Sequence, residues 1–333
     1  MSEIEGTNSG TGSLRARIAG IGGYLPARIV TNTELAAEKN IDTSDEWIME
    51  RTGIRQRHIA NETETATYMA TRAAQAALDD AGVSADQVDA IILATATPDE
   101  AFPATALRVQ AALGGTQGFG MDLSAACSGF IFALATAEAF MKVGTVKNVL
   151  VIGTEVYSRI MNWKDRGTCV LFGDGAGAVL LSPTTEPGIG ILSTHLHSDG
   201  RLGDLLYVDG AVGRSDKPGH LVMHGPEVFR HAVKKLAAAV DEALAANHLN
   251  KDDVDWLVPH QANRRIIDAM GKRLGLRPER SVVTVDRHAN TSAASIPLAL
   301  CEAWQDGRIK RGDLVLMEAL GGGMTWGSAL VRM

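Results

Sequence analysis

A cysteine, a histidine and an asparagine that lie far apart in the chain have the side chains best suited to chemistry. Cys127 stands in Asp122-Leu-Ser-Ala-Ala-Cys127-Ser-Gly-Phe130, between a short strand-like run and a long apolar helix. A thiol at a helix N-terminus meets unpaired N–H groups and the positive end of the helix dipole, which favour the nucleophilic thiolate. His260 and Asn290 supply the partners that a cysteine-based acyl-transfer site needs.

Each of the three residues also has an ordinary structural interpretation. Taken alone, Cys127 is a small core residue, His260 a hydrogen-bonded structural histidine and Asn290 a turn or cap residue. Papain-like proteases use the same three residue types, but place their cysteine near the mature N-terminus within a Cys-Gly-Ser/Ala-Cys-Trp/Tyr motif. This chain has its cysteine deep in an alternating α/β pattern, so the protease is the weaker alternative.

Composition limits the class of protein. The chain has 333 residues, of which 45% are hydrophobic, and a net charge of −7, so bulk charge gives no reason to expect nucleic acid or an anionic membrane as partner. Its three cysteines are an odd number and widely spaced, which favours a reducing cytoplasm over a disulfide framework. No apolar run reaches the length of a membrane span, and residues 1–14 predict a disordered tail.

The elements that must position these residues alternate between strand and helix. The predicted order in the first half is strand, helix, strand, helix, strand: 88–95, 105–113, 118–123, the helix after Cys127, and 148–154. This order predicts parallel strands with crossover helices and therefore an α/β fold.

The second half of the chain repeats this plan. Val88-Asp-Ala-Ile-Ile-Leu93 resembles Val254-Asp-Trp-Leu-Val-Pro259, and the pattern predicts an internal duplication with halves 15–184 and 185–333. Counting back 17 residues from Gly144 and from Gly307 gives Cys127 and Asn290, so these two residues are expected at related positions. His260, at the carboxyl end of its strand, is expected to reach the same crevice.

Several longer motifs run along the chain: Asp42-Thr-Ser-Asp-Glu-Trp-Ile48, Arg51-Thr-Gly-Ile-Arg55, Ala125-Ala-Cys-Ser-Gly129, Asp165-Arg-Gly-Thr168, Phe172-Gly-Asp-Gly-Ala-Gly177, Pro259-His-Gln-Ala-Asn263, Asn290-Thr-Ser-Ala-Ala-Ser295 and Gly321-Gly-Gly-Met-Thr-Trp-Gly327. With these motifs the chain resembles one known family, β-ketoacyl-acyl carrier protein synthase III, the initiating condensing enzyme of type II fatty acid synthesis, in the thiolase superfamily. The resemblance covers the chain from about Ala16 to Met333.

The resemblance implies a five-layered αβαβα fold, a homodimer and a reaction in two stages. Cys127 takes an acyl group from acyl-CoA, with backbone N–H groups of Cys127 and Gly322 stabilising the oxyanion. Malonyl-acyl carrier protein then binds, and His260 and Asn290 donate hydrogen bonds to its thioester carbonyl during decarboxylation. No metal or organic cofactor is implied.

Further residues are assigned by the resemblance alone. Those matching the site for CoA and its pantetheine arm are Trp47, Arg51, Arg166, Met223, Phe229, Ala262 and Asn263. Those expected to dock the acidic carrier protein are Arg264, Arg265, Lys272 and Arg273.

The acyl pocket is expected to differ from that of relatives. Leu320 and Met324 stand where relatives commonly have phenylalanine, and both are more deformable than a ring. Phe102 matches a residue that reaches across the dimer to close the acyl pocket, which favours a short primer such as acetyl.

Three alternatives differ from this reaction in the substrates or residues that they need. A secondary-metabolite acyltransferase with the same residues and another primer or acceptor is the main one. A hydroxymethylglutaryl-CoA synthase would need a glutamate as general base near the cysteine, which the sequence does not indicate. A non-catalytic carrier-binding protein would not need the intact set of Cys127, His260 and Asn290.

Overall fold

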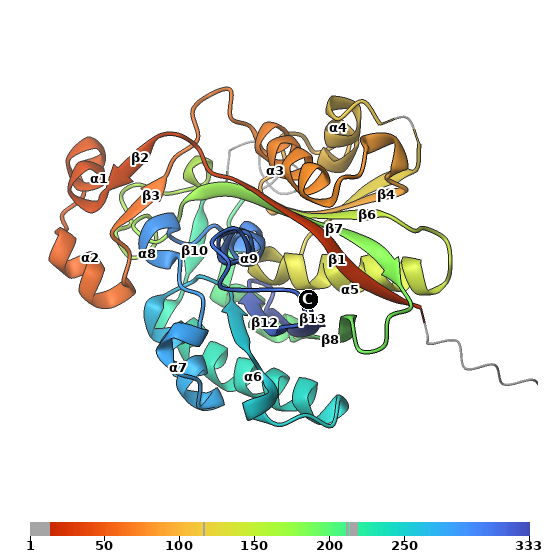
Figure 1. The fold of residues 1–333 in the computed structure, drawn as a ribbon. Coiled ribbons are helices and arrows are strands. Elements are labelled where there is room, and N and C mark those ends of the chain that lie inside the picture. Colours follow the sequence, from red (N-terminus) through yellow and green to blue (C-terminus); the bar gives the residue numbers. More distant parts are fainter. Residues whose placement is uncertain (1–13, 116, 211–212, 214–218) are drawn as a thin grey trace, which may run out of the picture.

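The computed structural model describes residues 14–115, 117–210, 213 and 219–333, and most of the predicted tail (1–14) lies outside the described residues. Two sheets and their helices form five layers (Figure 1). The strands are β1 (Arg15–Tyr24), β2 (Ile29–Thr31), β3 (Gln56–His58), β4 (Ala90–Ala94), β5 (Phe119–Leu123), β6 (Val149–Val156), β7 (Asp174–Thr184), β8 (Gly190–Ser198), β9 (Leu206–Val208), β10 (Leu221–Met223), β11 (Trp256–Pro259), β12 (Leu314–Gly321) and β13 (Thr325–Arg332). The α-helices are α1 (Asn32–Lys39), α2 (Asp45–Thr52), α3 (Ala66–Ala81), α4 (Thr105–Ala112), α5 (Gly129–Lys142), α6 (Gly225–Ala246), α7 (Arg264–Leu274), α8 (Val285–His288) and α9 (Ser295–Gln305).

The first sheet has the order β1-β7-β6-β4-β5. β4 pairs in parallel with β5 and β6, as the alternating pattern predicts, whereas β7 pairs antiparallel with β6 and β1. The sheet is therefore mixed, because the chain passes from β6 to β7 without a crossover helix.

The second sheet repeats this arrangement in the order β11-β12-β13-β8. β11 and β12 are parallel, while β13 is antiparallel to both of its neighbours. Beyond β11, Ser281 forms an isolated parallel bridge with Leu257, in the place that β5 takes beside β4. This agreement supports our proposal that the halves divide between 184 and 185.

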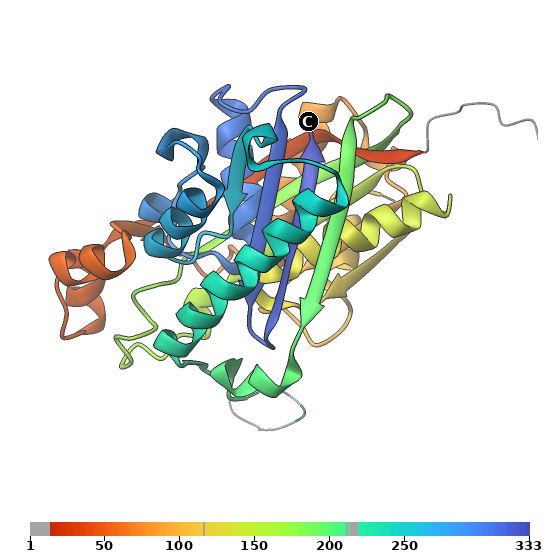
Figure 2. The same ribbon diagram turned by 90° about the horizontal axis from the view of Figure 1, so that it is seen from below.

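Helices α5 and α9 lie between the two sheets, with α3 and α4 over the first sheet and α6 and α7 over the second (Figure 1). Seen from below, the cyan helix α6 crosses the strands of the second sheet (Figure 2). α5 and α9 bury most of their residues, including Phe130, Ile131 and Leu298. Burying each such side chain contributes about 1.5–3 kcal/mol, so the central layer holds the two halves together.

The two central helices correspond from their N-terminal ends. A residue with positive φ precedes each: Ala126 (45°) opens the 3-10 helix η2 (Ala126–Ser128), and Ser292 (49°) opens η7 (Ser292–Ala294). Counting from these positions pairs Cys127 with Ala293 and corrects the predicted pairing with Asn290. The prediction counted back from Gly144 and Gly307, beyond the C-terminal ends of the two helices. That count fails because α9 has 11 residues and α5 has 14.

No helix within the described ranges is both long and apolar enough to cross a membrane.

Candidate active site

Cys127 lies in η2, just before α5 begins at Gly129. Its side chain is buried, at 5% exposure, and β12 packs tightly against its backbone. A Cβ atom on Gly321 would lie 2.5 Å from the Cys127 nitrogen, so the close approach of these two backbones requires a glycine. The Gly321–Gly323 run therefore borders the thiol, as the sequence predicts.

Burial decides the protonation state of the thiol. The pKa of Cys127 is raised to about 12, chiefly by burial and also by the nearby Glu155 carboxylate, while the Ser292 hydroxyl and the Cys127 backbone N–H lower it. The expectation that the helix end makes the thiolate the favoured form is therefore wrong for the protein without substrate. Attack by this sulfur requires that its proton be taken as the reaction proceeds.

His260 follows β11 and is held at both its backbone and its ring. Its N–H donates to the Glu318 carbonyl at 2.8 Å, and its Nδ1 lies 2.6 Å from the Ser295 hydroxyl. Burial lowers the pKa of His260 to about 3, so the imidazole is neutral near pH 7. A neutral ring of this kind donates one N–H and accepts at the other nitrogen.

Asn290 lies at the start of the loop before α9. Its backbone N–H donates to the Leu171 carbonyl at 2.9 Å, and its carbonyl accepts from the Gly173 N–H at 3.0 Å. Its Oδ1 accepts from the Ser292 N–H at 2.8 Å. Because the oxygen is taken, the Nδ2 amide hydrogens remain for a ligand in the cavity that Asn290 lines.

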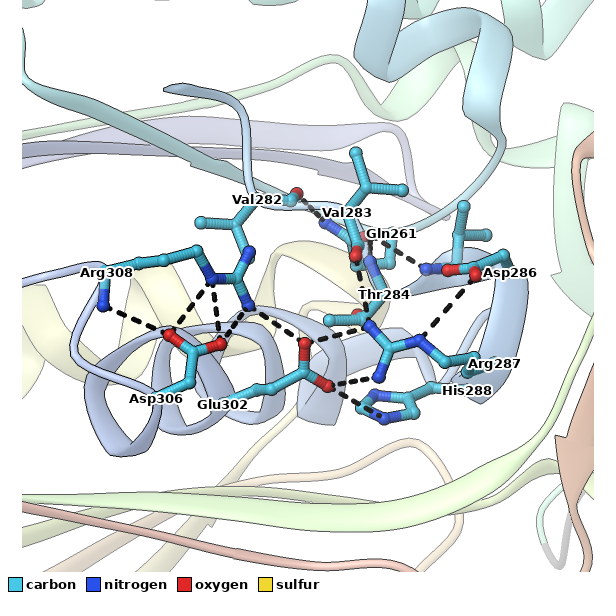
Figure 3. Close-up of polar contacts among 11 residues, drawn as sticks. Gln261, Val282, Val283, Thr284, Asp286, Arg287, His288, Glu302, Asp306 and Arg308 are labelled. Atoms are coloured by element: carbon cyan, nitrogen blue, oxygen red, sulfur yellow. Dashed lines mark hydrogen bonds and ion pairs between the residues drawn. The ribbon is translucent and has the colours of Figure 1, made fainter. Parts of the chain in front are cut away.

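Gln261 ties the strand that carries His260 to the segment that leads to Asn290 (Figure 3). Its Nε2 donates to the Pro259 carbonyl at 2.8 Å and the Val282 carbonyl at 3.1 Å, while its Oε1 accepts from the Thr284 N–H at 2.8 Å. These bonds are buried, so the whole amide is satisfied. No sequence pattern singles out Gln261, because its role appears only when the two segments are brought together.

A second contact ties α8 to α9 in the same region. Glu302 accepts from two nitrogens of Arg287 at 2.6 and 2.8 Å and from Arg308 at 3.0 Å (Figure 3). Such bidentate pairs hold their partners in a fixed geometry. This network thus holds α8, which leads into Asn290, against α9.

Cys127, His260 and Asn290 line one cavity of about 350 Å³. Six of the residues predicted to contact CoA line it too, namely Trp47, Arg51, Met223, Phe229, Ala262 and Asn263. The cavity is mostly apolar, with its chemically active groups gathered together, as small-molecule sites generally are.

Trp47 and two arginines gather at one end of this cavity. The Arg51 and Arg166 guanidinium carbons lie 4.5 Å and 5.1 Å from the centroid of the Trp47 ring. Arg166 does not itself line the cavity, although its neighbour Gly167 does. The cluster combines a flat aromatic surface with two cations, which suits a nucleotide bearing phosphates.

Gly53 and Asn263 fix this cluster against α7. Gly53 ends α2 with φ at 76°, and a Cβ there would lie 2.5 Å from the Cβ of Arg264. Asn263 caps α7 through its Oδ1 and donates from Nδ2 to the Arg51 carbonyl at 3.0 Å. The motifs around Arg51 and Asn263 are therefore one structural unit.

The four predicted docking residues are all exposed on α7. Two of them are paired: Arg264 with Asp268 at 2.7 Å, and Arg273 with Asp241. Arg265 donates to the Glu50 carbonyl at 3.0 Å, beside the Trp47 end of the cavity. Arg265 and Lys272 therefore carry the charge that is least neutralised on this helix.

A second cavity, of about 650 Å³, is also lined by Cys127, together with Gly322. Of the three residues predicted for the acyl pocket, none lines this cavity: Leu320 lines the first one, Met324 is fully buried in the core, and Phe102 is 84% exposed. The apolar residues that do line it include Tyr157, Ile160, Phe172, Leu206, Val208 and Leu221. They come from distant segments, so no local pattern could have identified them.

Comparisons with known proteins agree with this geometry. Family models described as 3-oxoacyl-[acyl-carrier-protein (ACP)] synthase III and its C-terminal part match residues 121–200 and 244–333. A β-ketoacyl-[acyl-carrier-protein] synthase III from Acidiphilium cryptum is 69% identical over 96% of this chain and 99% of its own length.

Two solved structures extend the comparison. The 3-oxoacyl-[acyl-carrier-protein] synthase III from Aquifex aeolicus is 48% identical, with a TM-score of 0.90 over 96% of this chain and 100% of its own. A priming β-ketosynthase from a polyketide biosynthetic pathway is 36% identical, with a TM-score of 0.90 over 98% of this chain and 99% of its own. The fold is thus thiolase-like, and the chain belongs to the 3-oxoacyl-[acyl-carrier-protein] synthase III family of condensing acyltransferases.

Proposed function

We propose that this protein condenses an acyl-CoA primer with malonyl-acyl carrier protein, giving 3-oxoacyl-acyl carrier protein, CoA and carbon dioxide, and so initiates type II fatty acid synthesis. One observation carries the proposal: Cys127, His260 and Asn290 line a single cavity that also contains Trp47 and Arg51. The names of the related proteins support the same reaction.

In the first stage, the Cys127 sulfur attacks the thioester carbon of the acyl-CoA in the first cavity. The carbonyl oxygen becomes an oxyanion, and we assign its stabilisation to backbone N–H groups of Cys127 and Gly322, which border the second cavity together. Collapse of this intermediate releases CoA and leaves the acyl group on Cys127. Trp47, Arg51 and Arg166 hold the nucleotide end of CoA during this step.

In the second stage, the malonyl thioester takes the place of CoA. His260 is neutral and Asn290 presents its Nδ2, so both donate hydrogen bonds to the thioester carbonyl as carbon dioxide leaves. The resulting enolate needs donors that cannot protonate it readily, and a neutral imidazole and an amide meet this need. The carbanion then attacks the acyl-cysteine. The reaction requires no metal or organic cofactor.

A homodimer is part of the proposal. Phe102 is 84% exposed and Met121 is 36% exposed, and Met121 lies on β5, which among the described residues pairs only with β4. An exposed sheet edge with apolar neighbours is a natural place for a second copy to add its own edge strand. A light-scattering mass equal to one chain would contradict the homodimer.

We also propose a cytoplasmic location. The three cysteines are buried free thiols, which a reducing compartment preserves.

The preferred primer is proposed to be acetyl-CoA, with Phe102 of a second copy narrowing the second cavity. The 650 Å³ of this cavity in one chain also favours a second candidate, a priming acyltransferase of secondary metabolism with a larger primer. The similarity to a polyketide priming ketosynthase supports this candidate.

The test is intact-protein mass after exposure to short, branched and long acyl-CoAs, beside Cys127→Ala, with malonyl-acyl carrier protein added afterwards. We expect an acetyl adduct that is lost in the variant and is discharged as a 3-oxoacyl product with carbon dioxide. A larger adduct in preference to acetyl would favour the second candidate. No adduct with any acyl-CoA would refute both.

A further inference from the structure

Arg57 is a cation in the interior of the protein, and the reaction described so far gives it no part. It lies on β3 and is fully buried. In the described ranges it forms no ion pair with an aspartate or a glutamate. Burial lowers the pKa of Arg57 to about 10, so the guanidinium is still charged near pH 7. Burying a charge costs free energy that hydrogen bonds must offset, so the partners of this cation indicate its role.

The guanidinium of Arg57 donates to two segments that are distant in the chain. Its Nη1 donates to Asn32 Oδ1 at 2.8 Å and to the Val30 carbonyl at 3.2 Å, where β2 leads into α1. Its Nη2 donates to the Val170 carbonyl at 2.8 Å, and Val170 is 113 positions away in the sequence. A guanidinium presents its N–H groups in a rigid fork, which holds such acceptors in fixed relative positions. Arg57 therefore joins the start of α1 to the segment around Val170.

Asn32 extends this connection to α2, the helix at the nucleotide end of the first cavity. Its side chain is fully buried, and its Oδ1 accepts from Arg57. Its Nδ2 donates to the Asp45 carboxylate at 2.7 Å and to the Ile54 carbonyl at 2.7 Å. Asp45 is the first residue of α2, and Ile54 lies just beyond the end of this helix. Both ends of α2 are therefore bonded to one amide, which Arg57 holds in turn. Figure 1 shows α1, α2, β2 and β3 together at one side of the molecule.

The segment around Val170 carries the other part of the nucleotide cluster. The Arg166 guanidinium carbon lies 5.1 Å from the centroid of the Trp47 ring, and Arg166 donates to the Asp42 carbonyl at 2.7 Å. Gly167 and Val170 both line the first cavity. Because Arg166 lies shortly before Val170 in the chain, the bond to the Val170 carbonyl limits where the Arg166 guanidinium can lie relative to α2.

We propose that Arg57 is a positioning residue for the nucleotide end of CoA, because it fixes α2 and the segment around Val170 at the separation that this nucleotide requires. Trp47 and Arg51 lie on α2, whereas Arg166 lies on the other segment. The nucleotide cluster is thus assembled from the two parts that Arg57 joins. Arg57 itself is buried and does not line the cavity, so it acts through these neighbours. The inference rests on the proposed function for its ligand and adds a determinant of the affinity for acyl-CoA.

Arg57→Lys is the first test, because it keeps the buried charge and removes the fork. An ammonium is a single point of charge, so it does not hold the Asn32 amide and the Val170 carbonyl in the geometry that the guanidinium imposes. The matched control is Arg311→Lys. The Arg311 guanidinium also donates to two backbone carbonyls, those of Ile18 and Ala19, and it does not line the first cavity.

Two acyl donors separate positioning of the nucleotide from a general structural role. One is the acyl-CoA that the wild type accepts best, and the other is the same acyl group on pantetheine, which has the thioester and the arm but no nucleotide. Acylation of Cys127 is followed by intact mass. For Arg57→Lys we expect the KM for acyl-CoA to rise about tenfold with a smaller change in kcat, and acylation by acyl-pantetheine to stay within about twofold of the wild type.

Asp45→Ala tests the same connection from the surface, and it decides the question if Arg57→Lys does not fold. Asp45 is exposed, so this change removes the bond from Asn32 to the start of α2 and leaves the interior intact. Glu46→Ala is the matched control, because it removes the same charge from the first turn of α2 and leaves the bonds of Asn32 in place. We expect the KM for acyl-CoA to rise about threefold in Asp45→Ala and not in Glu46→Ala.

Equal losses with acyl-CoA and acyl-pantetheine would show that Arg57 supports the whole site, and they would overturn the proposal. A KM for acyl-CoA that is unchanged in Arg57→Lys and in Asp45→Ala would overturn it too, as would rises of the same size in the two control variants. A wild type that neither donor acylates would instead refute the proposed function and, with it, this inference.

Discussion

The side-chain oxygen of Asn290 accepts a hydrogen bond from the backbone N–H of Ser292 at 2.8 Å. This one bond determines which end of the amide is left for the cavity. It also depends on the left-handed backbone of Ser292, whose φ is 49°. The same residue thus orients the proposed donor of the second stage and lies beside the nucleophile of the first.

Replacing Asn290 by aspartate tests the amide donor. The carboxylate keeps the shape and the bond from Ser292, but it has no N–H to give to the thioester carbonyl. We expect condensation to fall by about 10²–10³, as for removal of one oxyanion donor, with acylation of Cys127 largely retained. Carbon dioxide release and intact mass measure the two stages. Equal losses in both stages would contradict a role in the second stage alone.

Trp47→Leu tests the proposed nucleotide contact. The ring is flanked by Arg51 and Arg166, so its loss removes a stacking surface of about 1–2 kcal/mol and should raise the KM for acyl-CoA about tenfold with a smaller change in kcat. Trp304→Leu is the control, because Trp304 also has a guanidinium over its ring, from Arg311, and does not line the cavity. A similar KM in both variants would be evidence against the CoA assignment.

Arg265→Glu tests docking of the acidic carrier protein. Reversing one exposed charge at the cavity mouth should raise the KM for malonyl-acyl carrier protein about three- to tenfold at low salt, with a smaller effect at high salt because screening weakens exposed charges. Arg277→Glu, just beyond α7, makes the same charge change away from the mouth. An unchanged carrier-protein KM at low salt would argue against the surface, and so would an equal effect in both variants.

Glu318 predicts how stability depends on pH. Burial raises its pKa to about 8, and its Oε2 has no hydrogen-bond partner in the part of the chain that the structure describes. Because the folded pKa is above the unfolded one of about 4.5, the unfolded state releases its proton first, and stability falls as the pH rises from about 4.5 to about 8, where the loss is nearly complete. The loss is on the order of a few kcal/mol.

Glu318→Gln should remove this loss. Its melting temperature should exceed that of the wild type at about pH 9 and come close to it at about pH 5. Differential scanning calorimetry at both pH values provides the measurement. A variant that is less stable at the higher pH would show that the ionised carboxylate is stabilised by contacts we have not recognised.

The sequence determined the elements that carry the site. Alternating apolar runs and amphipathic segments predicted β4, α4, β5 and β6 to within a few residues, because buried strands and helices leave strong local periodicities. The motifs around Trp47, Cys127, His260 and Asn290 predicted residues that line the cavity. They could do so because each motif specifies a particular backbone conformation within a few consecutive residues.

Tertiary structure decided what depends on residues distant in the chain. Burial under β12 and the neighbouring Glu155 raise the pKa of Cys127 and favour its thiol form. These effects outweigh that of the helix N-terminus, which is the feature that the local sequence shows. The second cavity is lined from several loops and strands, and Gln261 joins β11 to the segment before Asn290. Burial, electrostatic coupling and hydrogen bonds between distant segments have no local signature, so only the folded chain reveals them.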